Sequence, residues 1–365
     1  MRIFIRADGG EIIGLGHIMR MLVLAKELRK TNKVIFICKS SSSENSLKKV
    51  DTNNYSTFDF RNDKFKTGIE KVIENGFQVL IIREEHIIDD IIELQKVYKA
   101  DLIITDSYDV DEEYFNRLKA FFEINGYMDD VNKCKMNVDF IINQNINAED
   151  INYKSNINKC TKLFLGTKYC LLREEFRENY NKKTIKEKTE DVLLTLGGMD
   201  RDYNTIKILN EIVSCNVNIH VAVGGAFDDK LIKELYELSK DFCNLKVYEN
   251  ANMSALMKKC DIAISACGST LYELCAMNIP IIGIIIADNQ ELVAKKMKEK
   301  FLIIEAYYID ELKEGNLKSS LNKLINDKKL RNEIINNQCN VVNVHGVKNL
   351  TAEINKLKRI FNISR

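Results

Sequence analysis

The sequence lacks a large excess of charge of either sign. It carries 54 Lys and Arg side chains against 53 Asp and Glu side chains, a formal net charge of +1. No global field therefore attracts nucleic acid or an anionic membrane, so we expect neither as a partner, and any affinity for phosphate must come from a local site. No stretch approaches the roughly 20 apolar residues that span a bilayer, and the N-terminal apolar run is too short for a signal peptide. The sequence therefore predicts a cytoplasmic protein without a membrane span.

Closely spaced cysteine pairs are also missing, and proline is scarce. None of the ten cysteines forms a C-x-x-C pair, and Pro280 is the only proline. Disulfide frameworks suit small secreted domains, and structural zinc sites need ligands at short spacing. We therefore expect reduced, buried thiols and no metal site, and we attribute the scarcity of proline to compositional bias rather than to function.

The first half of the chain alternates short apolar runs with amphipathic ones. The predicted strands are Arg2–Ala7, Val34–Lys39, Gln78–Ile82, Asp101–Asp106, Ala120–Ile124 and Phe140–Asn143. The predicted helices are His17–Leu28, Gly68–Asn75, His86–Tyr98 and Asp111–Lys119. Strands that alternate with helices indicate parallel β-α-β units and a doubly wound α/β sheet.

The second half repeats this alternation. The predicted strands are Val192–Leu196, Asn218–Val223, Leu245–Tyr248, Ile262–Ser265, Ile281–Ile285 and Leu302–Ile304. The predicted helices are Tyr203–Ser214, Lys230–Ser239, Met253–Lys259, Ser269–Met277 and Glu291–Lys298. At 365 residues, the chain has the length of two ordinary domains.

A charged stretch with few apolar residues separates the two halves and is typical of a linker. We expect an N-terminal Rossmann-like domain over residues 1–177, a linker over 178–191, a C-terminal Rossmann-like domain over 192–346 and a terminal helix over 347–365. Ligands of open α/β sheets bind at the carboxyl ends of the strands, so we expect the two domains to face each other across a ligand-binding cleft.

A glycine-rich turn joins the first predicted strand to the first helix. It reads Asp8-Gly-Gly-Glu-Ile-Ile-Gly14-Leu-Gly16-His17-Ile-Met-Arg20, and its glycines let the backbone approach a bulky ligand near a helix N-terminus that favours negative charge. A dinucleotide fingerprint would need a glycine in place of the methionine before Arg20 and an acidic residue near the end of the second strand. Both are missing, as is a Walker A loop, which disfavours a nicotinamide enzyme and a P-loop enzyme.

His17 is the candidate general base in this turn. A lone histidine is more often structural, but this one begins a helix at a predicted ligand site, and the positive helix end favours the neutral imidazole that a base requires. Arg20 shares a helix face with His17 and is either a group that neutralises substrate charge or an ordinary solvent-exposed arginine. Asp8, Gly14 and Gly16 complete this set of candidate substrate-binding residues.

A second constellation follows the strand at Ile262–Ser265. Gly268, Ser269 and Thr270 open a helix, and their amides and hydroxyls suit a diphosphate. Glu273 lies one turn further on, where a carboxylate can accept the hydroxyls of a ribose. The alternative is a capping box, in which Ser269 or Thr270 caps the helix and Glu273 bonds back to a backbone N–H.

Weaker candidates also lie at strand ends. They are Gly197 and Gly198 after a strand, Tyr108 within Asp106-Ser-Tyr-Asp, and Asn289 and Gln290 after the strand that follows Pro280. Each of these residues is equally compatible with a purely structural role in its loop.

Taken together, these motifs resemble the UDP-2,4-diacetamido-2,4,6-trideoxy-β-L-altropyranose hydrolase family of pseudaminic acid biosynthesis and its relatives in spore-coat polysaccharide synthesis. The motifs are Arg2-x-x-x-Arg-x-Asp, Gly14-x-Gly-His-x-x-Arg, Asp106-Ser-Tyr-Asp, Asn143-Gln-Asn, Gly166-Thr-Lys-Tyr-Cys-Leu-Leu-Arg-Glu-Glu-Phe, Leu196-Gly-Gly, Ser265-Ala-Cys-Gly-Ser-Thr-Leu-Tyr-Glu-Leu-Cys and Asp288-Asn-Gln. They span about residues 1–300. Cys267 departs from the small residue that relatives carry at that position.

The resemblance implies the two-domain glycosyltransferase-B architecture and hydrolysis of a UDP-sugar without metal or cofactor. His17 would activate water that displaces UDP with inversion. Tyr108 and Asn289 would lie near the sugar-phosphate, and Ser269, Thr270 and Glu273 would hold UDP. The segment beyond about residue 300 receives no functional assignment.

Two other functions remain compatible with these motifs. One is a glycosyltransferase of the same fold that uses a sugar or lipid acceptor, and the other is a non-catalytic nucleotide-sugar binding protein. A structural role is disfavoured by the glycine-rich strand ends. The patterns indicate no particular oligomeric state.

Overall fold

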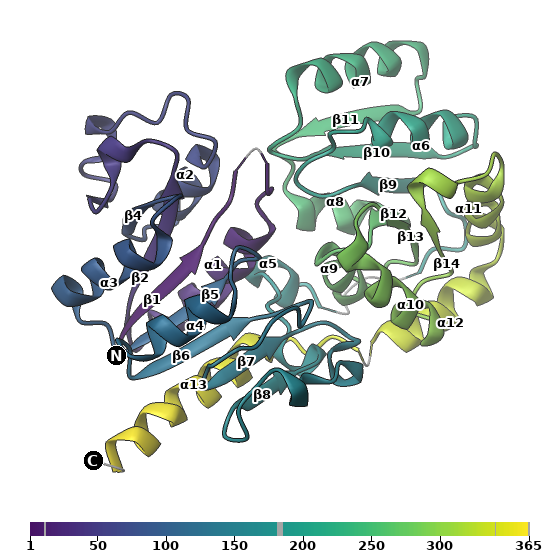
Figure 1. The fold of residues 1–365 in the computed structure, drawn as a ribbon. Helices are drawn as coiled ribbons and strands as arrows, with labels where there is room; N and C mark the ends of the chain where they lie inside the picture. Colours follow the sequence, from purple (N-terminus) through teal and green to yellow (C-terminus); the bar gives the residue numbers. More distant parts are fainter. Residues whose placement is uncertain (11, 181–184, 340, 364–365) are drawn as a thin grey trace. The chain divides into compact units, whose positions relative to one another are not determined.

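The protein consists of two compact units in the computed structural model, which describes residues 1–10, 12–180, 185–339 and 341–363 (Figure 1). Unit 1 comprises Met1–Leu171 and His345–Arg365, and unit 2 comprises Leu172–Val344. The boundary at Leu171 lies six residues before the end of the N-terminal domain expected from the sequence. The physical reason is that Phe176 is fully buried and that α5 (Glu174–Arg177) packs against α9 (Thr270–Ala276) of unit 2.

Unit 1 is an eight-stranded sheet covered by helices on both faces. Its strands are β1 (Arg2–Ala7), β2 (Lys33–Ser40), β3 (Lys49–Val50), β4 (Val79–Arg83), β5 (Leu102–Asp106), β6 (Ile124–Met128), β7 (Phe140–Asn143) and β8 (Lys162–Leu165). Its helices are α1 (Gly16–Leu28), α2 (Lys66–Glu74), α3 (Ile87–Tyr98), α4 (Glu112–Lys119) and α13 (Gly346–Ile363). The strand order is β3-β4-β2-β1-β5-β6-β7-β8, and every pair is parallel except β3 with β4.

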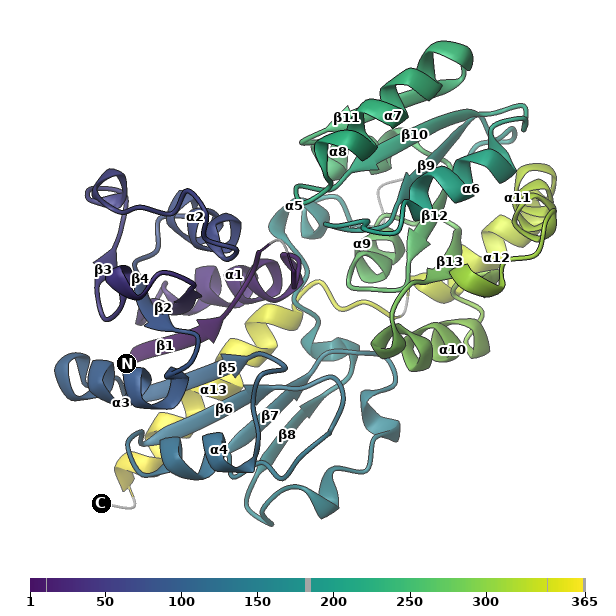
Figure 2. The same cartoon turned by 45° about the horizontal axis from the view of Figure 1, so that its top comes forward.

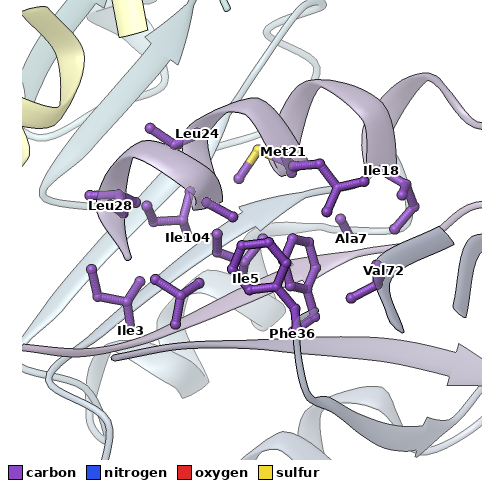
Figure 3. Packing of buried hydrophobic residues seen from close by; sticks show 14 of the residues in the cluster. Ile3, Ile5, Ala7, Ile18, Met21, Leu24, Leu28, Phe36, Val72 and Ile104 are labelled. Atoms are coloured by element: carbon purple, nitrogen blue, oxygen red, sulfur yellow. The ribbon is translucent and has the colours of Figure 1, made fainter. Parts of the chain in front are cut away.

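Alternating side chains of β1 point to opposite faces of this sheet. Ile3 and Ile5 pack with α1, α2 and α13, whereas Phe4 packs with α3 and α4. Figure 3 shows Ile18 and Met21 of α1 directed toward the strands beneath them. Burial on both faces is what the nearly continuous apolar composition of these strands requires. It fixes α1, and the turn before it, against the carboxyl end of β1.

The terminal helix α13 belongs to unit 1 although it follows the whole of unit 2 in sequence. Val347, Leu350, Ile354 and Leu357 are buried in the same core cluster as α1, and Figures 1 and 2 show the yellow helix lying against the sheet of unit 1. The helical spacing of the tail is therefore confirmed. The tail forms part of the helical layer on one face of the N-terminal sheet, together with α1 and α2.

Unit 2 is a six-stranded parallel sheet in the order β11-β10-β9-β12-β13-β14. Its strands are β9 (Asp191–Thr195), β10 (Asn218–Val223), β11 (Leu245–Glu249), β12 (Ile262–Ala266), β13 (Ile281–Ile285) and β14 (Glu305–Tyr308). Besides α5 and α9, its helices are α6 (Asn204–Ile212), α7 (Asp229–Asp241), α8 (Met253–Lys259), α10 (Glu291–Glu299), α11 (Asn316–Asn326) and α12 (Lys328–Gln338).

Each sheet has one point at which the strand order reverses. In unit 1 the chain proceeds outward from β1 through β2 in one direction and from β5 in the other, so the reversal lies between β1 and β5. In unit 2 it lies between β9 and β12. Ligands of doubly wound folds bind at such points, at the carboxyl ends of the strands. The turns after these four strands are therefore where binding residues belong.

Two predicted strands are wrong. The segment Ala120–Ile124 is not a strand, because Ala120 ends α4, Phe122 packs into the core, and β6 begins only at Ile124. Gly126 weakened the strand signal of β6, yet a side chain there would collide with the ring of Phe140 on the neighbouring strand.

The segment Leu302–Ile304 is likewise not a strand, although Leu302 and Ile303 are fully buried. Strand β14 starts at Glu305 and is a half-exposed edge strand with weak alternation. The short edge strands β3 and β8 and the helices α5, α11 and α12 were not predicted.

Six of the ten cysteines are buried, as expected for interior thiols. Across residues 1–10, 12–180, 185–339 and 341–363, no helix combines the length and apolar character needed to cross a bilayer.

Candidate functional site

His17 lies at the first turn of α1 and is hydrogen-bonded to a carboxylate at the end of β5. Its Nδ1 is 2.6 Å from Oδ1 of Asp106, which is completely buried, while the His17 side chain is 12% exposed. An ionised carboxylate can only accept hydrogen bonds, so Nδ1 is the donor and Nε2 is left as the basic nitrogen. This arrangement orients the ring and fixes its tautomer.

Arg20, one helical turn after His17, holds the same carboxylate. Its Nε and Nη2 donate to the two oxygens of Asp106 at 2.7 and 2.6 Å, and its Nη1 donates to Asp130 at 2.8 Å. The Arg20 side chain is only 12% exposed, so the alternative of a solvent-exposed helix arginine is wrong. Because its donors are engaged by two carboxylates, Arg20 orients Asp106 rather than leaving a free positive charge for substrate.

Tyr108 completes this network from the loop after β5. Its hydroxyl donates to Oδ2 of Asp130 at 2.8 Å, and its ring packs edge to face on the imidazole of His17, with ring centroids 4.8 Å apart. Asn145, after β7, donates to the other oxygen of Asp130 at 3.1 Å. Asp130 therefore connects three strand-end loops around the imidazole.

The charge pattern keeps Asp106 ionised. Burial opposes the charged form, but the positive charge of Arg20 and the contact with His17 outweigh it and hold the pKa of Asp106 well below its usual range. The same pairing, against the opposing effect of burial, raises the pKa of Arg20. The imidazole of His17 therefore lies beside the ionised carboxylate of Asp106, whose negative charge is partly compensated by the guanidinium of Arg20.

The glycine loop before His17 is closed on itself. Gly10 and Gly14 exchange two backbone hydrogen bonds of 3.0 and 2.9 Å, and Gly14 has a φ of +69°, which favours glycine. The amide of Gly14 is therefore engaged within the loop. Gly16 begins α1 and is exposed, so the open approach expected at the helix start is present there.

Asp8 does not join the histidine network. It is 2% exposed, pairs with Arg6 at 2.9 Å, and accepts the backbone N–H of Lys39 at 2.8 Å. Lys39 in turn pairs with Asp109. Asp8 thus stabilises a buried charge cluster between β1 and β2, separate from the His17–Asp106 pair.

In unit 2, the glycine turns follow the strands at the reversal of strand order. Gly197 has a φ of +92°, and Gly198 is exposed. A side chain at Gly224 would strike the backbone of both glycines, so the turns after β9 and β10 are in close contact. After β12, Gly268 and Thr270 are half-buried and Ser269 is exposed.

The start of α9 has no side-chain cap. Ser269 is the N-cap residue but makes no capping hydrogen bond, and within the described residues no backbone carbonyl accepts from the amides of Gly268, Ser269 or Thr270. Glu273 does not fold back to the backbone either. The capping-box alternative is therefore wrong, and these amides point to no acceptor of their own domain.

Glu273 instead forms a two-point ion pair with Arg173. Nε and Nη2 of Arg173 donate to Oε1 and Oε2 of Glu273 at 2.7 and 2.9 Å. Nearby, after β13, the amide of Gln290 comes within 4.0 Å of where a side chain at Gly268 would begin, and Asn289 is exposed beside it. The strand-end residues predicted in this half thus gather at one edge of the sheet.

Four residues with clear structural roles were not predicted as site residues: Asp106, Asp130, Asn145 and Arg173. Asp130 follows β6, whose strand was misplaced in the prediction, and Asn145 follows β7. Polar residues directly after a parallel strand were the available signal. Nothing local in the sequence indicates that Arg173 reaches Glu273, because 100 residues separate them.

The solved structures define the class. The chain has the glycosyltransferase-B fold of two Rossmann-like domains. MurG of Acinetobacter baumannii superposes with a TM-score of 0.61 at 13% identity, covering 97% of this chain and 99% of that chain. Glycosyltransferase VinC in complex with dTDP gives a TM-score of 0.57 at 11% identity, covering 99% and 100%. The fold class expected from the sequence is confirmed.

A family model and curated relatives bear on the resemblance drawn from the motifs. Residues 201–354 match the glycosyltransferase family 28 C-terminal domain. The UDP-2,4-diacetamido-2,4,6-trideoxy-β-L-altropyranose hydrolase of Campylobacter jejuni is 24% identical over 84% of this chain and 100% of its own length. The uncharacterized protein MJ1062 of Methanocaldococcus jannaschii is 30% identical over 86% of this chain, which spans only 61% of that protein. The family resemblance drawn from the motifs is confirmed by these relatives.

Proposed function

We propose that this protein hydrolyses a UDP-linked diacetamido-trideoxy hexose to UDP and the free sugar, in the cytoplasmic biosynthesis of a nonulosonic acid such as pseudaminic acid. The observation that carries the proposal is the bond between Nδ1 of His17 and the ionised carboxylate of Asp106. It leaves Nε2 as a positioned base. The similarity to a relative named as a UDP-sugar hydrolase supports the substrate class.

In the proposed reaction, Nε2 of His17 removes a proton from water while the water oxygen attacks the anomeric carbon. The bond between that carbon and the diphosphate oxygen breaks, and its electron pair leaves with UDP. A single displacement inverts the configuration at the anomeric carbon. Asp106 stabilises the imidazolium that forms, and Arg20 and Tyr108 keep both groups in place.

Unit 2 is proposed to bind the nucleotide. The unpaired amides before α9, with the hydroxyls of Ser269 and Thr270, suit the diphosphate and stabilise its departing charge. Glu273 is proposed to accept a ribose hydroxyl. Gly197 and Gly198 keep the neighbouring turn open, and Asn289 and Gln290 supply amide groups at the same edge.

The test is incubation of the protein with candidate UDP-sugars in ¹⁸O-labelled water without any acceptor. We expect UDP release, with ¹⁸O in the anomeric hydroxyl of the sugar and none in UDP. The His17→Ala variant should turn over about 10²–10⁴-fold more slowly than wild type and keep its affinity for UDP. His86→Ala is the matched control, since His86 is an exposed histidine before α3 and makes no capping bond.

Two outcomes would assign a different function. Sugar release that requires an added sugar or lipid acceptor would identify a glycosyltransferase. UDP binding without turnover of any substrate, and with no difference between wild type and His17→Ala, would identify a binding protein.

A further inference from the structure

The guanidinium of Arg173 is held on three sides within unit 2. It makes the two-point contact with Glu273, its Nη1 lies 2.9 Å from Oε1 of Glu175, and it stacks over the ring of the buried Phe176 at 4.7 Å. Its side chain is 28% exposed and that of Glu273 is 13% exposed. A planar guanidinium fixed in this way can hold a carboxylate in one orientation, which a lysine ammonium cannot.

This contact leaves part of the Glu273 carboxylate free. A carboxylate has about four lone-pair sites, and Arg173 occupies one on each oxygen. One site on each oxygen can still accept a hydroxyl. Glu273 lies in the first turn of α9, beside the unpaired amides at which the diphosphate is proposed to bind.

Burial works against the charged form of this group. It raises the pKa of Glu273, and the hydrogen bonds and positive charge of Arg173 oppose that rise. Without Arg173, the carboxyl group would take up a proton more readily and would lose acceptor capacity. Arg173 thus controls both the orientation and the ionisation of the residue proposed to contact ribose.

We propose that Arg173 is a positioning residue that holds Glu273 ready for the ribose hydroxyls and so sets the preference for a ribonucleotide over its 2′-deoxy analogue. This inference rests on the proposed binding of UDP by unit 2. It concerns the nucleotide specificity of that site and is independent of whether the protein transfers or hydrolyses the sugar.

The test is calorimetric titration of the full-length protein with UDP and with 2′-deoxy-UDP. A hydroxyl bonded to a charged acceptor contributes about 1.5–3 kcal/mol, so wild type should bind UDP at least about tenfold more tightly than 2′-deoxy-UDP. Arg173→Met should weaken the binding of UDP more than that of the deoxy analogue, which keeps only the 3′-hydroxyl, and so reduce this ratio toward one. Its UDP affinity should also rise with pH, because Glu273 ionises later.

Two further variants separate positioning from a merely structural role. Arg173→Lys keeps the charge without the planar contact and should show an intermediate ratio. Glu174→Gln removes an exposed carboxylate of the same segment that, among the described residues, forms no ion pair with Arg173, and should leave the ratio unchanged. Circular dichroism would establish that each variant is folded. If Arg173→Met does not fold, the comparison of wild type with Arg173→Lys is the test.

The outcomes are distinguishable. If wild type binds neither nucleotide, the proposed UDP site itself is wrong. If wild type prefers UDP and Arg173→Met and Arg173→Lys keep the full preference, only the role of Arg173 is overturned. Tighter UDP binding by Arg173→Met would also overturn it, because Arg173 would then compete with ribose for Glu273.

Discussion

The ionisation of Asp106 is decided by two neighbours from a different segment of unit 1. Its Oδ1 accepts hydrogen bonds from His17 and Arg20, and its Oδ2 accepts a second one from Arg20. All three side chains are largely buried. Paired in this way, a buried carboxylate stays charged where an isolated one would neutralise. The N-terminus of α1, which is apparent from the sequence, therefore supplies only part of the electrostatic field at His17. The carboxylate of Asp106 is the closer charge.

Replacing Asp106 by Asn tests this role. The amide can present its N–H₂ to Nδ1 and stabilise the wrong tautomer, in which Nε2 carries the proton and cannot act as a base. We expect kcat to fall by about 10²–10⁴ while UDP affinity is retained. Asp109→Asn is the control, because Asp109 lies in the same loop but pairs with Lys39. Equal activity of the two variants would show that the His17–Asp106 contact is not catalytic.

At the scale of elements, the turn between β1 and α1 depends on backbone conformation as much as on side chains. Gly14 adopts a left-handed conformation that closes the Gly10–Gly14 bridge, whereas Gly16 is an ordinary first residue of a helix. A side chain would meet no atom within 4 Å at either position. Any difference between alanine substitutions at these sites is therefore conformational.

Gly14→Ala should destabilise the protein by about 1–2 kcal/mol, because an L-residue is strained at a φ of +69°. Gly16→Ala should be neutral or slightly stabilising, since alanine is the better helix former. Urea unfolding of the two variants measures the difference. A loss of stability in Gly16→Ala as large as in Gly14→Ala would contradict this account of the turn.

At the scale of the whole molecule, the chain returns to its first unit at the end. Helix α13 contributes Leu350 and Ile354, both fully buried, to the core that supports α1. The base of the proposed reaction is thus carried by a helix whose packing depends on the last residues of the chain. Loss of that packing should loosen unit 1 without a matching effect on unit 2.

Leu350→Ala should cost about 2–5 kcal/mol through lost burial and a residual cavity. We expect hydrogen–deuterium exchange to show faster exchange in peptides from β1 and α1, with peptides from β9 and β12 unchanged. Lys348→Ala, an exposed change in the same helix, should stay within about 0.5 kcal/mol of wild type. Equal loss of protection in both units would mean that α13 does not belong to the folding unit of the N-terminal sheet.

The elements that the sequence predicted correctly are those with strong local patterns. Strands β1, β7, β10 and β13 and helix α8 have the expected bounds, since buried parallel strands and amphipathic helices repeat over a few residues. The prediction misplaced β6 because Gly126 weakens the local strand pattern. Glycine is required there because a side chain would collide with the ring of Phe140 on the neighbouring strand. The edge strands β3, β8 and β14 were missed or misplaced because they are short and partly exposed.

The sequence by itself determined the two-sheet α/β class and the strand-end turns that carry His17 and Gly268-Ser269-Thr270, because hydrophobic periodicity and glycine-rich turns are local properties. Only the tertiary structure decided which carboxylate meets His17, 89 residues away, and that Arg173 rather than a helix cap engages Glu273. These contacts depend on strand order and side-chain packing, which bring distant segments to the same edge of a sheet.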